Sequence, residues 1–323
     1  MKNLTIAIPT WNRASRLNIF LKQLLDHIES SKFNSEVEVL VSDNGSTDDT
    51  RTIILSHQPL YLEKKVAFVH LENPAADSFF DENVRRCYEG SSGQYVWFSS
   101  DDDNLYPEAI STIMETINYE NSGAFYFNFK QPPYCEKNPL IKKNSINEFI
   151  DKESIDELHQ IVSYPKLTSM VIRNGVKSSQ PKVKELGFYH VELFIRAAHQ
   201  FGGFVKSKQF VAYADDDCMD QIRYIPYVGN GLNEQLREFL PEINLMDYYQ
   251  SLKVPHTCPL SSSLNMLGAF YRNKIEVPDF IRKELWSTIS KEFRWENISV
   301  ASMLEIIKFV LSFSILRRKW RVD

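Results

Sequence analysis

Three consecutive carboxylates, Asp101-Asp102-Asp103, follow an apolar run of strand character that extends from Tyr95 to Ser99. Adjacent acids repel one another and lose hydration when buried, so such a run is stable on a solvated loop or beside a cation that neutralises it. Mg²⁺ and Mn²⁺ prefer oxygen ligands, and they commonly bind between one or two protein carboxylates and the phosphates of a substrate. The triplet therefore predicts either a divalent-metal site or an acidic surface turn.

Two further polar clusters also come directly after apolar runs. Thr10-Trp11-Asn12-Arg13 follows the run Leu4 to Ile8, and Asp43-Asn44-Gly45-Ser46 follows the run Val37 to Val41. Ligands of open parallel sheets bind outside the carboxyl ends of the strands, so the three clusters share one crevice if these strands are neighbours. A carboxylate and amides for a base or ribose, the Arg13 guanidinium for a phosphate and metal-binding acids would together recognise a nucleotide diphosphate.

Composition and missing motifs exclude several classes of protein. No Gly-x-Gly-x-x-Gly follows the first strand and no Gly-x-x-x-x-Gly-Lys-Ser/Thr occurs, which argues against a dinucleotide dehydrogenase and a P-loop NTPase. The net charge of -5 argues against a nucleic-acid partner. The 4 cysteines form no Cys-x-x-Cys pair, which argues against a zinc site or a disulfide framework. We see no secretory signal and expect a cytoplasmic protein.

Strand and helix patterns alternate through the first half of the 323 residues. Apolar runs predict strands over residues 4–8, 37–41, 67–71, 95–99, 123–129 and 210–214, and helical spacing predicts helices from about Ser15, from Asp48 or Asp49, over 83–89 and over 107–119. The expected N-caps are Ser15 for the first helix and Ser46 or Thr47 for the second. The order predicts an α/β fold with a mostly parallel, Rossmann-like sheet flanked by helices.

Together, the three clusters resemble a known signature. The segments are Ile8-Pro9-Thr10-Trp11-Asn12-Arg13, Val41-Ser42-Asp43-Asn44-Gly45-Ser46-Thr47-Asp48-Asp49-Thr50, and Gly93-Gln94-Tyr95-Val96-Trp97-Phe98 running into the acid triplet. In order and spacing they are similar to family 2 glycosyltransferases of the GT-A fold. The resemblance implies a metal-dependent enzyme that moves a sugar from a nucleotide-diphosphate donor, usually with inversion, to a glycan or lipid-linked acceptor in surface-polysaccharide synthesis.

The resemblance also implies roles for individual residues. Where many members carry Asp-x-Asp-Asp before a proline, this chain has Ser100 in the first position and Pro107 downstream. In that register Asp102, supported by Asp103, would bind Mn²⁺ or Mg²⁺, and Asp101 would face the ribose or sugar. The implied donor-binding residues are Pro9, Thr10, Asn12, Arg13, Asp43, Asn44, Asn83, Arg85 and Asp101. For Asn83 and Arg85 the alternative is that they lie on an ordinary solvated helix face and do not contact the donor.

An inverting transfer needs a general base, which the resemblance places in the segment from Gly187 to Arg196. His190 stands where family members carry an acid, and Glu192 is the nearest carboxylate. Histidine is competent because its ordinary pKa is about 6.5. The alternative for His190 is a helix-capping role. The second acid triplet, Asp215 to Asp217, is expected to be a solvated loop or an acceptor-side wall, or a competitor for the metal.

Residue 220 divides the expected organisation, with a catalytic domain over 1–220 and a helical region over 221–323 that contacts the acceptor, a second subunit or a membrane. Residues 302–321 combine an apolar segment, too short to span a bilayer, with basic residues and Trp320. This pattern suits peripheral contact with the inner face of the cell membrane. The alternative is a helix packed in the core or in a homo-oligomer.

Two other functions stay open at this point. Ser100 and His190 depart from the family pattern, so the chain could be a catalytically silent nucleotide-sugar-binding or scaffold protein. A nucleotidyltransferase would need a glycine-rich, lysine-containing loop after the first strand, and none is present there.

Overall fold

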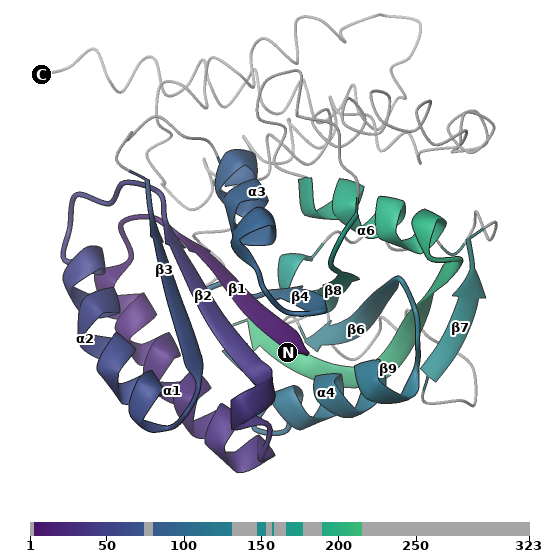
Figure 1. The fold of residues 1–323 in the computed structure, drawn as a ribbon, viewed down its shortest axis with the longest axis horizontal. Helices are drawn as coiled ribbons and strands as arrows, with labels where there is room; N and C mark the ends of the chain where they lie inside the picture. Colours follow the sequence, from purple (N-terminus) through teal and green to yellow (C-terminus); the bar gives the residue numbers. More distant parts are fainter. Residues whose placement is uncertain are drawn as a thin grey trace, which may run out of the picture.

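The computed structural model describes residues 3–73, 80–130, 147–152, 157, 166–176 and 189–214 (Figure 1). The strands are β1 (Leu4–Thr10), β2 (Val37–Asp43), β3 (Ala67–Glu72), β4 (Tyr95–Phe98), β5 (Asp103–Leu105), β6 (Ala124–Lys130), β7 (Asn147–Asp151), β8 (Met170–Arg173) and β9 (Gly203–Ala214). The helices are α1 (Ala14–Ser31), α2 (Thr50–Glu63), α3 (Phe80–Gly90), α4 (Ala109–Tyr119) and α6 (Tyr189–Gln200), with 3-10 turns η1 (Asn34–Glu36) and η3 (Leu167–Ser169).

These strands form one sheet in the order β3-β2-β1-β4-β8-β6-β9-β5, and β7 also pairs with β9. The expected parallel pairing holds for β3, β2, β1 and β4 and for the β6–β9 pair. β8 is antiparallel to both of its neighbours, and β9 is antiparallel to β5 and β7. The half of the sheet that follows β4 is therefore mixed, which the pattern of apolar runs did not indicate.

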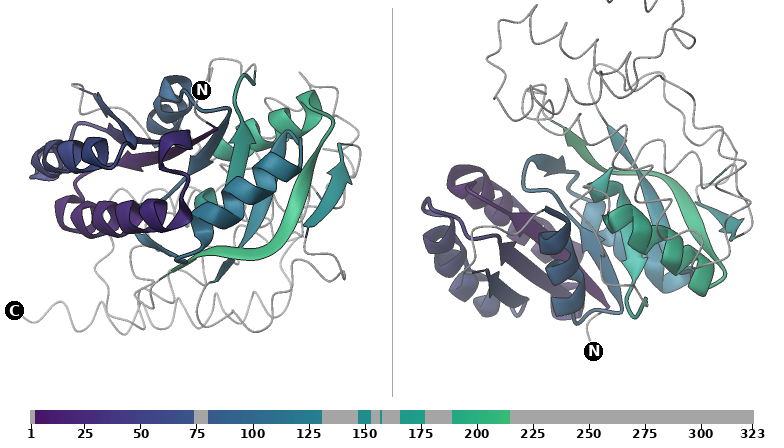
Figure 2. Two further views of the ribbon diagram at one scale, coloured as in Figure 1. Left: turned by 60° about the horizontal axis from the view of Figure 1, so that its bottom comes forward. Right: turned by 90° about the horizontal axis from the view of Figure 1, so that it is seen from above.

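Helices cover both faces of the sheet. α1, α2 and α4 bury their apolar side chains in one hydrophobic core, and α3 and α6 bury theirs in a second core on the opposite face. Figure 2 shows this layering from two sides, with α3 and α6 together on one face. Because β1 contributes side chains to both cores, it is buried along its whole length, as expected for a central parallel strand.

Helix α1 shows that the sequence pattern correctly predicts packing. The six apolar residues at helical spacing are all buried: Leu17, Phe20, Leu21, Leu24, Leu25 and Ile28. Strand β1 runs past Pro9, where the sequence predicted an end, and continues to Thr10. Pro9 is aligned with Ser42 of β2, whereas pairing with β4 stops at Ala7, so proline lies where β1 has a neighbour on one side only.

The predicted helix caps are wrong. The N-cap positions of α1 and α2 make no side-chain cap hydrogen bond, and Asp48 provides the acceptors for both helices. Its Oδ2 accepts from Ala14 N at 3.1 Å and its Oδ1 accepts from Thr50 N at 3.0 Å. Burial acts to raise the pKa of Asp48, but these bonds and the Thr50 hydroxyl outweigh it, and the pKa lies below its ordinary value. One carboxylate thus joins two helix starts that are distant in sequence.

Residues 215–323 lie outside the described residues, and with them the second acid triplet, the predicted 221–323 region and the apolar segment 302–321. Among the helices that the structure describes, none combines the length and apolarity needed to cross a bilayer.

We expect Asp48→Ala to lower the free energy of unfolding by about 1–2 kcal/mol at neutral pH, because two helix N-termini lose their acceptor. A group whose pKa is depressed by folding stabilises the protein above its unfolded pKa, so the difference should shrink as the pH falls below about 4. Urea titrations at several pH values measure it. The neighbouring Asp49→Ala is the control, because the Asp49 side chain makes no cap bond; equal losses in both variants would contradict the assignment.

Candidate functional site

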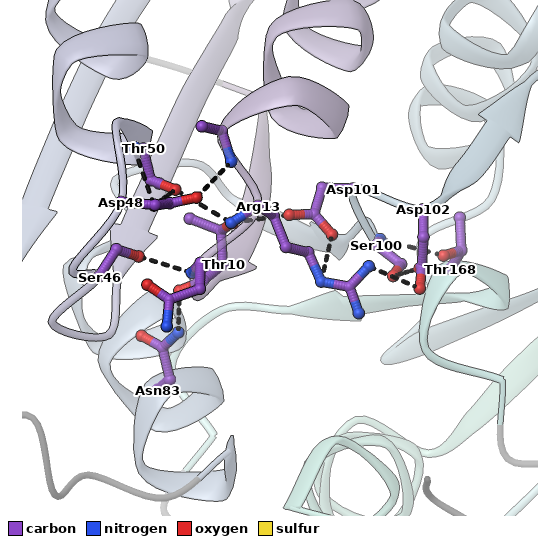
Figure 3. A network of polar contacts seen from close by, with 12 residues as sticks. Thr10, Arg13, Ser46, Asp48, Thr50, Asn83, Ser100, Asp101, Asp102 and Thr168 are labelled. Carbon is purple, nitrogen blue, oxygen red and sulfur yellow. Dashed lines mark hydrogen bonds and ion pairs between the residues drawn. The ribbon is translucent and has the colours of Figure 1, made fainter. Parts of the chain in front are cut away.

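The carboxyl ends of β1, β2 and β4 bring the three polar clusters together (Figure 3). Thr10 is aligned with Asp43 across β1 and β2, and Asn44 N donates to Thr10 O at 3.0 Å. Ser99 N, at the end of β4, donates to Ala7 O at 2.9 Å. Because each cluster directly continues one of three adjacent strands, the three clusters lie together at one edge of the sheet, as the sequence predicted.

Asp101 is held by the end of β1. The Thr10 hydroxyl donates to Asp101 Oδ2 at 2.6 Å, and Arg13 Nε lies 3.6 Å from Asp101 Oδ1. The Asp101 side chain is only 3% exposed. Burial raises the pKa of Asp101 to about 6, although Arg13 and Thr10 act to lower it. Asp101 is therefore a buried acid that fixes the β1 end against the β4 end.

Asp102 is the accessible acid of the triplet, with 23% of its side chain exposed. Arg13 Nη1 lies 3.0 Å from Asp102 Oδ2, and the Ser100 hydroxyl donates to Asp102 Oδ1. Figure 3 shows the Arg13 side chain reaching both Asp101 and Asp102. Burial acts to raise the pKa of Asp102, but Arg13 and Ser100 outweigh it, so the pKa is lowered and the group is ionised at neutral pH.

Asp103 points back into the protein, and its side chain is 3% exposed. Lys166 Nζ lies 3.2 Å from Asp103 Oδ1, and the Thr168 hydroxyl donates to Oδ2. Burial raises the pKa of Asp103, with Lys166 opposing the shift. Thr168 is fixed in turn, because its carbonyl accepts from Trp97 Nε1 at 2.8 Å and its hydroxyl accepts from Ser100 N at 3.2 Å.

These contacts decide how a divalent metal would fit. No group of three His, Cys, Asp or Glu side chains with metal-binding geometry occurs among the described residues. Asp102, which contacts Arg13 and Ser100, is the ionised and partly exposed acid of the triplet, whereas Asp103, which contacts Lys166 and Thr168, is nearly inaccessible. One carboxylate, with phosphate oxygens and water completing the shell, is a usual environment for Mg²⁺. The residues fit a metal held through Asp102, and the metal itself stays a prediction.

The loops after β1 and β2 are locked together. Asn12 has φ 51°, in the left-handed region that asparagine tolerates, and its N donates to Ser46 Oγ at 2.8 Å. Thr47 N donates to Asn12 Oδ1 at 2.7 Å, and Asp43 Oδ1 accepts from Ser46 N at 3.0 Å. Gly45 has φ 75°, as the predicted Asn-Gly turn requires. Asn12 and Asp43 thus set the loop geometry, and donor contact by either residue stays a prediction.

The remaining predicted donor residues occupy different environments. Asn44 accepts from Asn73 Nδ2 at 3.2 Å at the edge of the cluster. Asn83 is buried and exchanges two hydrogen bonds with Ser42, accepting from its hydroxyl at 2.6 Å and donating to its carbonyl at 3.1 Å. Its amide therefore clamps β2 to α3.

Arg85 forms ion pairs along its own helix. Its Nε donates to Glu82 at 2.8 Å and its Nη1 to Glu89 at 2.6 Å. This placement matches the alternative of an ordinary helix face, and it does not bring Arg85 to the acid triplet.

The two predicted bases lie in the first turn of α6. Tyr189 N donates to Asp81 Oδ1 at 3.0 Å, which joins the start of α6 to α3. His190 is buried, and Glu192 accepts from Arg196 Nε at 2.8 Å in a pair whose side chains are both buried. A general base must reach the acceptor hydroxyl directly or through one water molecule. Neither role is tested by this geometry, and the choice between them stays open.

Three further residues lie beside the predicted ones. Trp11 belongs to the first cluster but was given no role, and its side chain is 56% exposed between Thr10 and Asn12 in sequence. The sequence alone does not reveal this exposure. Lys166 and Thr168 enter through η3, far along the chain, and no motif surrounds them.

Comparison with known sequences gives a consistent result. Residues 5–169 match the profile described as Glycosyl transferase family 2. A GalNAc(5)-diNAcBac-PP-undecaprenol beta-1,3-glucosyltransferase of Campylobacter jejuni is 27% identical over 126 residues, which are 36% of this chain and 35% of that protein. The abequosyltransferase RfbV of Salmonella typhimurium is 28% identical over 111 residues, 34% of this chain and 31% of that protein. The matches thus span about a third of the length of these curated relatives.

Solved structures agree at the level of the fold. The mannosyltransferase PcManGT of Pyrobaculum calidifontis, solved in complex with GDP-Man and Mn2+, has a TM-score of 0.54 at 13% identity over 92% of this chain and 88% of that chain. S. aureus TarS has a TM-score of 0.50 at 15% identity over 90% and 89%. These similarities confirm the GT-A type α/β class expected from the sequence.

We expect Arg13→Gln to lower the free energy of unfolding by about 1–3 kcal/mol at pH 8, because two largely buried carboxylates lose their cation. The loss should become smaller toward pH 5. Without Arg13 the pKa of Asp101 rises further above its ordinary value and the pKa of Asp102 is no longer held below it, so protonation toward pH 5 removes part of the uncompensated charge.

Denaturant titrations across this pH range measure the loss. The control is Arg51→Gln, which breaks the exposed pair with Glu72, N–O distance 3.1 Å, and should change stability by about 0–1 kcal/mol at every pH. A loss for Arg13→Gln that did not vary with pH would mean that packing rather than charge is responsible.

Proposed function

The chain belongs to glycosyl transferase family 2, and on this premise we propose that it transfers a sugar from a nucleotide-diphosphate donor to a hydroxyl group of a glycan or lipid-linked acceptor, with inversion at the anomeric carbon. The observation that carries the proposal is the meeting of the β1, β2 and β4 ends around one accessible, ionised carboxylate, Asp102. The GDP-Man and Mn2+ bound to PcManGT, which shares the fold, support a nucleotide-sugar donor here.

In the proposed complex, the donor lies along the crevice with its diphosphate at Asp102 and Arg13. Mn²⁺ or Mg²⁺, held by Asp102, would neutralise charge on the departing nucleoside diphosphate. Arg13 would donate to a phosphate oxygen, which suits a guanidinium already positioned by the acids. Trp11 presents an exposed ring beside Thr10, where a base or ribose could pack on it. The buried pair of Thr10 and Asp101 would support the ribose side from behind.

The acceptor hydroxyl must lose a proton as it attacks, and His190 or Glu192 is the proposed base. The Glu192 carboxylate is already paired with Arg196 in the buried first turns of α6, which favours His190. The pair would then fix the helix turn that presents His190.

The biological setting is part of the proposal. The named activities of the two bacterial relatives, one on an undecaprenol-linked glycan and one an abequosyltransferase, support a role in bacterial surface-polysaccharide synthesis. We further propose that residues 1–220 form the catalytic domain, and that residues 221–323 serve the acceptor side. Residues 302–321 would contact the inner face of the cell membrane or a second subunit, in a cytoplasmic protein.

Donor hydrolysis in the absence of acceptor tests catalysis. With Mn²⁺ or Mg²⁺, the wild-type protein should slowly release nucleoside diphosphate from one member of a panel of UDP-, GDP-, CDP- and dTDP-sugars. Asp102→Asn should lower this rate by about 100-fold or more, because the accessible carboxylate is lost. Asp49→Asn, on an exposed side chain outside the crevice, is the control. Binding of a nucleotide sugar without turnover would instead favour the silent binding or scaffold protein.

The base is tested by comparing His190→Gln with Glu192→Gln. If His190 is the base, its substitution should lower kcat by about 10²–10⁴-fold while leaving nucleotide binding nearly unchanged. Glu192→Gln should mainly lower the melting temperature, because Arg196 loses a buried partner. Steady-state kinetics with thermal melts measure both effects. The reverse pattern, with kcat lost only for Glu192→Gln, would assign the base to Glu192.

A further inference from the structure

Lys166 pairs with the third acid of the triplet, whereas Arg13 pairs with the first two. It directly precedes η3, and its Nζ is 3.2 Å from Asp103 Oδ1. The same Nζ lies 4.2 Å from the centre of the Phe129 ring on β6, a cation–π distance. Two independent contacts therefore hold the ammonium group in one place.

Lys166 and Asp103 form an ion pair, but their side chains are exposed to different extents. The Asp103 side chain is 3% exposed, whereas the Lys166 side chain is 23% exposed. An ammonium group carries three N–H donors, and the carboxylate uses one direction of the three. Lys166 thus compensates a buried charge while part of its side chain faces solvent.

Short polar contacts connect Lys166 to the accessible acid. Its partner Asp103 accepts from the Thr168 hydroxyl, which accepts from Ser100 N, and the Ser100 hydroxyl donates to Asp102 Oδ1. Arg13 Nη1 lies 3.0 Å from Asp102 Oδ2. The two cations thus pair with neighbouring acids, and a diphosphate bound at Asp102 would lie next to both.

We propose that Lys166 is a binding residue for the donor diphosphate, donating from Nζ to a phosphate oxygen while Asp103 and Phe129 hold it in position. The inference rests on the proposed nucleotide-sugar donor. The competing explanation is a positioning role, in which Lys166 serves only to neutralise Asp103.

Asp103→Asn and the double variant Asp103→Asn/Lys166→Met separate the two explanations. Asp103→Asn removes the buried negative charge. Adding Lys166→Met to it therefore leaves no unpaired buried carboxylate that would destabilise the fold. Diphosphate binding predicts that UDP or GDP binds the double variant about tenfold more weakly than it binds Asp103→Asn, which corresponds to about 1.4 kcal/mol. A positioning role predicts equal affinity for the two variants.

Titration calorimetry and thermal shift with UDP and with GDP, each with Mn²⁺ and with EDTA, provide readouts independent of turnover. Uridine and guanosine, which lack phosphate, should bind the two variants equally. Lys166→Arg should retain diphosphate affinity within about threefold, because a cation remains. Lys22→Met on the exposed face of α1 controls for loss of one positive charge.

The outcomes also separate this inference from the proposed function. If the wild-type protein binds UDP or GDP and the two asparagine variants bind it equally, Lys166 is a positioning residue and the inference fails alone. If the folded wild-type protein binds none of the UDP, GDP, CDP and dTDP nucleotides, the donor proposal itself fails.

Discussion

Compensation of three adjacent negative charges is the constraint on which the rest of this site depends. Asp101, Asp102 and Asp103 leave β4 together, and burial disfavours the charged form of each. Arg13, at the start of α1, and Lys166, at the start of η3, form ion pairs with these carboxylates. Because Arg13 pairs with the first two acids and Lys166 with the third, charge compensation also fixes the β1 loop and the η3 turn relative to the end of β4.

A second layer of polar contacts keeps Arg13 in its place. Arg13 N donates to Thr50 Oγ1 at 3.0 Å, and the next residue, Ala14, donates to Asp48. The backbone that carries the Arg13 guanidinium is thus held by side chains at the start of α2. Asn12, in its left-handed conformation, closes the same loop against Ser46 and Thr47. The loops after β1 and β2 are consequently joined by side chains that accept hydrogen bonds from backbone amides of the other loop.

The sequence predicted the parts of the structure that follow from local pattern. The apolar stripe of α1, the strands of the parallel half and the convergence of three strand ends all follow from periodicity and strand order. It did not predict the antiparallel β8, because a short apolar run carries no information on direction. The caps were missed for a similar reason, since Asp48 acts on α1 from 34 positions away. Lys166 was missed because only tertiary contact brings it to Asp103. By contrast, Glu82 and Glu89 lie three and four residues from Arg85, and residues at these separations are neighbours on a helix surface. The ion pairs of α3 therefore follow from local spacing.

The roles within the acid triplet can be argued from burial without reference to a motif. Asp101 and Asp103 are nearly inaccessible, have raised pKa values and accept hydrogen bonds from threonine hydroxyls, so their contacts lie within the protein. Asp102 combines a lowered pKa with partial exposure. Alternation of side chains explains the difference only in part, because Asp101 and Asp102 lie in the turn after β4 and Asp103 begins β5. The stronger cause is that Thr10 holds Asp101 and Thr168 holds Asp103, which leaves the middle carboxylate partly exposed. The motif register, which predicts Asp102 as the metal ligand, and the burial of the three acids therefore favour the same residue, and its role in metal binding stays a prediction.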